Sequence, residues 1–249
     1  MSKIAISSVL LFLIFGASSV HAQVVDTDGD GLSDEMETSV YFTNGNNPDT
    51  DGDGFLDGEE IANGYSPRHG ENKKLRSVDS DNDGLWDDWE LALGTSLMNP
   101  DTDGDGYRDG DEVRNSYDPL STSSRKVAKR IEVSLGEQKL SYFFGDMKLD
   151  EFLISSGLPR TPTPTGEFRV LQKRPVVHYK GRNYDYPNTK WNLAFKRGRG
   201  YNYYIHGAWW HDDFGRRKSA GCVNVPYTYD YMGRLYDWAE VGTRVIIDN

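Results

Sequence analysis

The chain has 249 residues, with 28 Lys and Arg against 39 Asp and Glu, which gives a formal net charge of −11 at pH 7. This length suffices for one ordinary domain and a smaller one. After the first 22 residues, no segment approaches the roughly 20 apolar residues of a membrane helix, and no nucleotide loop, haem motif or nucleic-acid signature occurs. We therefore expect neither a membrane span in the mature chain nor a nucleic-acid partner.

The first 22 residues have the features of a secretory signal peptide. Lys3 precedes an apolar run at residues 9–15, and small residues follow up to Ala22. The run is too short to cross a hydrocarbon core of about 30 Å. We expect cleavage near Ala22 and export to the periplasm or another part of the cell envelope.

Charge divides the chain into two parts. Residues 1–125 hold eight Lys and Arg against 26 Asp and Glu, whereas residues 126–249 hold 20 against 13. A net charge of −18 is thus followed by one of +7. We predict a signal peptide at 1–22, an acidic repeat region at 23–119, a linker at 120–127 and a second domain at 128–249, with different partners for the two main parts.

Four segments of the acidic region repeat the pattern D-x-D-x-D-G-x-x-D-x-x-E. Carboxylates at positions one, three, five and nine can converge on an ion, the sixth-position Gly permits a sharp turn, and the twelfth-position Glu can offer both oxygens. These carboxylates would repel one another without a cation, and loops of this length suit Ca²⁺ better than Mg²⁺. A disordered acidic linker is the alternative. The predicted Ca²⁺ ligands are Asp26, Asp28, Asp30, Asp34, Glu37, Asp49, Asp51, Asp53, Asp57, Glu60, Asp79, Asp81, Asp83, Asp87, Glu90, Asp101, Asp103, Asp105, Asp109 and Glu112.

Each loop is expected to lead into a short helix. Pro48 and Pro100 disfavour a helix before two of the loops, whereas residues such as 86–93 can form one after the loop. Similar endings at 64–67 and 116–119 indicate two tandem pairs. Residues 26–119 resemble thrombospondin type 3 calcium repeats, which implies structural Ca²⁺ in a rigid spacer or docking arm. The two-loop cellulosomal dockerin is a weaker resemblance.

Residues 128–249 are predicted to form a mostly β domain. Apolar residues alternate along 131–135 and 140–144 around a turn at 136–137, a pattern typical of a hairpin. Further strands are expected near 168–171, 175–179, 203–206 and 244–247. One helix is expected near 229–238, where apolar residues share a face.

Cys222 is the single cysteine of the chain. In an exported protein, an unpaired thiol is a chance buried residue, half of an intermolecular disulfide or a nucleophile. With an ordinary pKa of about 8.5, a nucleophilic thiol needs a base, and that base needs an orienting group. His206 and Ser219 could fill these two roles.

The residues around Cys222 resemble those of the L,D-transpeptidases. The resemblance to the YkuD-like domain of this family covers about residues 128–248. It rests on the opening hairpin, on Thr-Pro-Thr-Pro-Thr-Gly-Glu-Phe at 161–168, on Ile-His-Gly at 205–207 and on Ser-x-Gly-Cys-Val-Asn at 219–224. The resemblance implies a β-sandwich with one or two helices. The family's usual His between Ser and Gly is replaced by Ala220, which predicts weaker substrate positioning or thiol activation.

The resemblance also implies acyl transfer on peptidoglycan peptide stems. Cys222 attacks a tetrapeptide stem and expels its terminal D-amino acid, His206 accepts and returns the proton, and an acceptor amine resolves the thioester. The N–H groups of Gly221 and Cys222 are candidate donors to the oxyanion. No cofactor is expected for this chemistry.

Three functions stay open at this point. They are a transpeptidase, an L,D-carboxypeptidase or hydrolase of the same fold that uses water or cleaves a wall-attached protein, and a calcium-dependent wall-binding protein with a decayed catalytic domain. Retention of Cys222, His206 and Ser219 argues against decay. His211 is a second candidate base, although we interpret it as a solvated loop residue. Trp209 and Trp210 either line the donor groove or pack in the fold.

Overall fold

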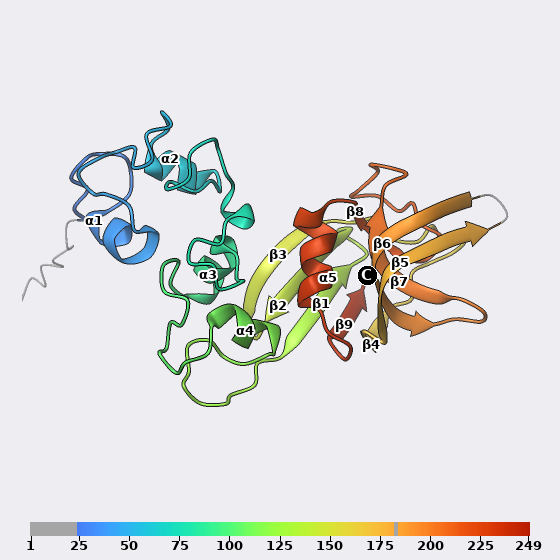
Figure 1. The fold of residues 1–249 in the computed structure, drawn as a ribbon. Helices are drawn as coiled ribbons and strands as arrows, with labels where there is room; N and C mark the ends of the chain where they lie inside the picture. Colours follow the sequence, from blue (N-terminus) through green and yellow to red (C-terminus); the bar gives the residue numbers. More distant parts are fainter. Residues whose placement is uncertain (1–23, 182–183) are drawn as a thin grey trace, which may run out of the picture.

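The computed structural model describes residues 24–181 and 184–249, so the predicted signal peptide lies outside the described residues. Asp-rich loops with short helices come first, and a β-rich domain follows (Figure 1). This arrangement confirms the predicted fold class. Within the described ranges, no helix has the length and apolar character of a membrane span.

Each Asp-rich loop leads into a short helix, as predicted. The helices are α1 (Asp34–Met36), continued by η1 (Glu37–Tyr41), then α2 (Asp57–Ala62), α3 (Asp87–Leu93) and α4 (Asp109–Arg114), and the turn η2 (Leu75–Ser77) lies between α2 and α3. All four α-helices begin at the ninth residue of their loop. Acidic residues fill the first turns, where the helix dipole favours negative charge.

The second part contains two β-sheets. The first has the strand order β3-β2-β1-β9-β4, formed by β1 (Lys129–Ser134), β2 (Lys139–Phe144), β3 (Met147–Leu153), β4 (Gly166–Arg169) and β9 (Arg244–Asp248). The second has the order β5-β6-β7-β8, formed by β5 (Gln172–Gly181), β6 (Tyr184–Arg197), β7 (Asn202–Ala208) and β8 (Val223–Pro226). Among the strand pairs of the described residues, only β1–β9 and β7–β8 are parallel.

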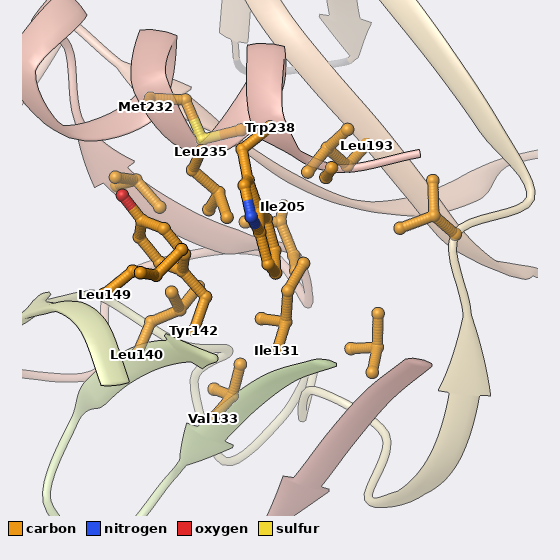
Figure 2. Close-up of a cluster of buried hydrophobic side chains, with 14 of the residues drawn as sticks. Ile131, Val133, Leu140, Tyr142, Leu149, Leu193, Ile205, Met232, Leu235 and Trp238 are labelled. Carbon is orange, nitrogen blue, oxygen red and sulfur yellow. The ribbon is translucent and has the colours of Figure 1, made fainter. Parts of the chain in front are cut away.

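The core lies between the sheets and the helical segment that follows β8. This segment, η3 (Tyr229–Gly233) with α5 (Arg234–Trp238), occupies the predicted helix position. Figure 2 shows its apolar side chains facing those of β1, β2, β6 and β7. The buried side chains labelled there include Ile131, Leu140, Tyr142, Leu193, Ile205, Met232, Leu235 and Trp238.

The third and fourth repeats pack on the β-rich domain. Leu85, Trp89, Leu93 and Val113 belong to the same buried cluster as the side chains between the sheets. The Trp89 ring meets Tyr142 edge to face, with centroids 6.0 Å apart. In Figure 1, α3 and α4 lie beside β2 and β3, whereas α1 and α2 lie farther out. Only the first two repeats thus project from the domain.

Candidate functional site

Parallel pairing of β7 and β8 brings the predicted base near the predicted nucleophile. The register places His206 opposite Asn224. Cys222 lies in the bend directly before β8, two residues before Asn224. The backbone of Tyr204, two residues before His206, is close enough to the Cys222 sulfur to lower the pKa of the thiol. The parallel register therefore places Cys222 beside the strand that carries His206.

The imidazole of His206 is buried and held at one nitrogen. Its Nδ1 lies 2.8 Å from the carbonyl oxygen of Gly207, so Nδ1 carries the hydrogen and donates it. Nε2 is then left as the acceptor. Burial lowers the pKa of His206 to about 4, so the ring is neutral at pH 7, which is the form a general base requires.

Cys222 is half-buried, and its thiol holds its proton at neutral pH. Burial raises its pKa to about 11, and the hydrogen bond from the Tyr204 backbone opposes that shift. Because thiol and imidazole are both neutral at pH 7, the site does not contain a preformed ion pair. The chemistry that this arrangement permits is proton transfer to His206 during attack by sulfur.

Ser219 shapes the turn before Cys222. Its hydroxyl accepts from the N–H of Gly221 at 3.1 Å and donates to the carbonyl oxygen of Cys222. Gly221 needs its φ of +119°, and a Cβ there would lie 3.0 Å from the ring of Tyr203. The predicted orienting role of Ser219 is wrong in this structure, because the carbonyl of Gly207 orients the base. The predicted oxyanion donor at Gly221 is already hydrogen-bonded.

His211 is tied into the site. Its Nε2 lies 3.0 Å from the side-chain amide of Asn224, and its Nδ1 accepts from the N–H of Asp213 at 3.2 Å. A neutral imidazole accepts at one nitrogen only, so the Asn224 amide must present its oxygen to Nε2–H. That orientation also gives a partner to the buried Asn224 Oδ1. The interpretation of His211 as a solvated residue is therefore wrong.

In the Asp-rich loops, the carboxylates at positions one, three and five converge. In each loop, one oxygen from each of these residues lies within 4.8 Å of the others. Backbone N–H groups of the turn donate hydrogen bonds to the first Asp. In the first loop, for example, the Asp26 carboxylate accepts from the N–H groups of Gly29 and Gly31. The residues are Asp26, Asp28 and Asp30, Asp49, Asp51 and Asp53, Asp79, Asp81 and Asp83, and Asp101, Asp103 and Asp105.

Oxygens at positions three and twelve are buried without a hydrogen-bond partner in all four loops. These residues are Asp28, Asp51, Asp81 and Asp103, with Glu37, Glu60, Glu90 and Glu112. Burial, with the charges of nearby Asp residues, raises the pKa of Glu60 and Glu112 to about 7 and that of Glu90 to about 10. A bound cation would be coordinated by these unpartnered oxygens and would favour the charged form of the carboxylates. The donor set fits Ca²⁺.

The ninth-position carboxylates, which were predicted as Ca²⁺ ligands, also accept hydrogen bonds within their own loops. Each accepts from both the N–H and the hydroxyl of the second residue in its loop, as Asp57 does from Thr50 at 2.8 and 2.6 Å. These bonds tie the beginning of the loop to the helix. The same pattern occurs at Asp34, Asp87 and Asp109.

The loops contact each other in pairs. Asp30 of the first loop accepts from the N–H of Gly58 in α2, and Asp83 of the third accepts from Gly110 in α4. In the first pair, Asp57 also lies with Asp30 and Glu37 in a buried acidic cluster. The loops therefore form two tandem pairs, as their repeated endings indicate.

Family models match both parts of the chain. Residues 26–39, 49–64, 79–95 and 101–120 match the bacterial TSP3 repeat, and residues 128–247 match the L,D-transpeptidase catalytic domain. The NMR structure of the catalytic domain of the Enterococcus faecium L,D-transpeptidase is 30% identical, and the match covers 96% of that chain and 48% of this one with a TM-score of 0.42. Residues 128–247 are an L,D-transpeptidase catalytic domain.

Solved L,D-transpeptidases from two organisms match about half of this chain. One from Mycobacterium smegmatis is 23% identical over 50% of this chain and 60% of its own, with a TM-score of 0.45. A Cys-to-Ser mutant of the E. faecium enzyme is 30% identical over 49% and 50%, with a TM-score of 0.44. The chain thus spans half to three fifths of these two structures. No curated protein matches it.

The L,D-transpeptidase domain is joined to its repeats by a buried ion pair. Arg234 of α5, whose side chain is 1% exposed, contacts both carboxylate oxygens of Asp88 in α3, at 2.6 and 2.9 Å. Its guanidinium lies 4.6 Å from the centre of the Trp89 ring. Asp88 and Trp89 thus face the domain, while Glu90 faces the third loop. Helix α3 connects the two.

Three contributors to the L,D-transpeptidase site were missed by the sequence prediction. The carbonyl of Gly207 has no side-chain signature, although it follows the predicted base directly. The ring of Tyr179 stacks on His206 at 4.5 Å between centroids, and Asn224 holds His211. Tyr179 reaches the site through strand pairing, which no local pattern reveals, whereas Asn224 ends the Ser-x-Gly-Cys-Val-Asn motif but was given no role.

Proposed function

We propose that the mature chain is an exported cysteine-dependent L,D-transpeptidase that acts on peptidoglycan tetrapeptide stems in the periplasm or cell envelope. The observation that supports this most is the neutral, buried imidazole of His206, tied at Nδ1 to Gly207, beside the strand that follows Cys222. The net charge of +7 over residues 126–249 suits an anionic wall polymer. We keep the predicted domain boundaries, 1–22, 23–119, 120–127 and 128–249.

In the first step, Cys222 Sγ attacks the carbonyl that follows the L-centre of the donor stem. Nε2 of His206 takes the thiol proton as the carbon–sulfur bond forms. The tetrahedral oxyanion then collapses to a thioester and expels the terminal D-amino acid, whose nitrogen receives that proton. With Gly221 N–H bound to Ser219, we assign the oxyanion to the N–H of Cys222.

In the second step, an acceptor amine attacks the thioester carbonyl and gives a proton to Nε2 of His206. The thiolate leaves and recovers its proton, and a new amide bond remains. The acceptor amine belongs to a second stem or to a wall-attached protein. Water in place of the amine would make the same site an L,D-carboxypeptidase or hydrolase.

We further propose that the repeats bind Ca²⁺ as a structural ion. Convergent carboxylates at positions one, three and five, with unpartnered oxygens at positions three and twelve, support this assignment. The ninth-position Asp residues close the loops. The ions would supply charge compensation and rigidity to the arm and take no part in acyl transfer.

Product analysis tests the proposed function. Residues 23–249 are incubated in Ca²⁺ with disaccharide tetrapeptide, and soluble products are identified by mass spectrometry. We expect release of the terminal D-amino acid together with cross-linked dimers, and neither product from Cys222→Ala. Release without dimers would favour the carboxypeptidase. An absence of turnover with several stem types would favour a calcium-dependent wall-binding protein.

A further inference from the structure

The β5–β6 hairpin places an aromatic ring on the catalytic base. Strand β6 is kinked where Asn188 and Trp191 have φ values of 54° and 57°. Its register with β5 shifts between Val177 and Tyr179, and such bulges bend a strand and re-aim its side chains. Asn192 pairs with Arg174 in that register, yet its side chain is reached by Tyr179, five positions further along β5.

Tyr179 is anchored at its hydroxyl. The hydroxyl donates to Asn192 Oδ1 at 2.7 Å. Asn192 is fully buried, and its Nδ2 donates to the carbonyl oxygens of Arg174 and Thr189 at 3.1 and 2.9 Å. Asn192 also lies opposite His206 in the β6–β7 pairing. The anchor of the Tyr179 ring is therefore fixed relative to the strand that carries the base.

The Tyr179 ring covers one face of the imidazole. The two rings stack with centroids 4.5 Å apart and an interplanar angle of 27°. Trp210 approaches the same imidazole at 5.7 Å, and Tyr204 meets Tyr179 edge to face at 5.8 Å. Burial, and after it the nearness of Cys222, raise the pKa of Tyr179.

A single hydrogen bond cannot fix the plane of the imidazole. The bond from Nδ1 to Gly207 leaves the ring free to tilt about the N–H···O axis. A ring stacked on one face removes that freedom and keeps water from the same face. We infer that Tyr179 is a positioning residue that holds the imidazole of His206 in the plane from which Nε2 takes the Cys222 proton. This inference rests on the proposed function.

Two substitutions separate the ring from its anchor. Tyr179→Leu removes the stacked ring, and Tyr179→Phe keeps the ring but loses the bond to Asn192. We expect Tyr179→Leu to lower kcat about 100-fold with KM changed less than about threefold, because misplacement of a catalytic group affects the chemical step. Tyr179→Phe should lose only about threefold in kcat. The matched control is Tyr184→Leu, on the same hairpin, whose ring stacks on Tyr186.

A second measurement does not need turnover. Cys222 is the only cysteine, so its alkylation by iodoacetamide followed against pH reports this thiol alone. At acidic pH the rate falls when His206 becomes protonated and can no longer accept the thiol proton. In Tyr179→Leu, water reaches the imidazole and raises the pKa of His206. The midpoint of the fall in alkylation rate should therefore move to a higher pH by about one unit. In Tyr179→Phe the shift should be a few tenths of a unit in the same direction, which tests the inference even if the leucine variant does not fold.

The possible results distinguish positioning from other roles. The inference is supported if Tyr179→Leu loses kcat and shifts the alkylation profile while Tyr179→Phe keeps most of the native kcat. A folded Tyr179→Leu variant with unchanged kcat and an unchanged profile overturns it, as does a rise confined to KM, which would mark a substrate contact. A shifted profile in a protein without transpeptidation would leave positioning in place and reject the proposed function.

Discussion

Replacing Asp88 by Asn removes one charge from the ion pair that joins the third repeat to the catalytic domain. Breaking a fully buried pair costs about 3–5 kcal/mol. The Asp88 side chain is 25% exposed, and Asn keeps one acceptor for the guanidinium, so screening reduces the expected cost to about 1–3 kcal/mol. For a chain of this size, that corresponds to a fall in Tm of about 2–12 °C.

Thermal unfolding of residues 23–249 in Ca²⁺ measures this effect with two probes. Tryptophan fluorescence includes Trp89 at the junction, whereas far-UV circular dichroism follows the sheets. Because Leu85, Trp89 and Val113 share the core of the catalytic domain, both probes should report one transition that shifts as a unit. The matched control is Asp146→Asn, since Asp146 is fully exposed and lies 4.0 Å from Arg130. It should leave Tm unchanged.

An unchanged Tm in Asp88→Asn would refute the reasoning. Two separate transitions, with only the fluorescence one shifted, would refute it as well. Either result would mean that α3 rests on the catalytic domain without sharing its cooperative unfolding.

Other residues give further predictions. Chelation of Ca²⁺ should lower the Tm of the protein. Calorimetric titration should show that Glu90→Gln binds Ca²⁺ more weakly than the native chain. Because α3 packs on the domain, Glu90→Gln in Ca²⁺ should also lower Tm more than Glu37→Gln in the outer repeat. The acidic limb of kcat/KM should lie near pH 4, where His206 becomes protonated. The pKa of His206 in the folded protein, about 4, is below the ordinary 6.5, so the unfolded state binds more protons between pH 4 and 6.5. Denaturant titrations should therefore show that the free energy of unfolding rises from pH 4 to 6.5. Ser219→Ala removes both hydrogen bonds that shape the turn before Cys222 and should lower kcat about tenfold in a turnover assay. An unchanged kcat would leave the turn without a role.

Local alternation predicted the strands that carry clear apolar periodicity. The hairpin of β1 and β2, the strand with His206 and the final strand β9 all follow this pattern. Strand β6 was missed because Pro187 and the positive φ values of Asn188 and Trp191 break its period. Strand β3 was missed because Lys148, Asp150 and Glu151 obscure its alternation, and Asp150 is held by Arg76 of the repeats.

The candidate site divides in a similar way. Cys222 and His206 belong to short motifs, so their chemistry is readable from residue type and spacing. The carbonyl of Gly207 adjoins the predicted base but has no side-chain signature, and the ring of Tyr179 reaches the site through strand pairing, which no local signal encodes. In the repeats, the spacing of Asp and Glu predicted the convergent carboxylates, but it did not reveal that the ninth-position Asp binds the second residue of the loop.

Intact-mass spectrometry of residues 23–249 in Ca²⁺, during reaction with a disaccharide tetrapeptide, tests acyl transfer through Cys222 most directly. We predict a transient mass increase equal to the donor stem without its terminal D-amino acid, located on the peptide that contains Cys222 and absent from Cys222→Ala. Release of the D-amino acid by Cys222→Ala, or turnover by the native chain with no adduct on Cys222 under rapid quenching, would contradict the proposed mechanism.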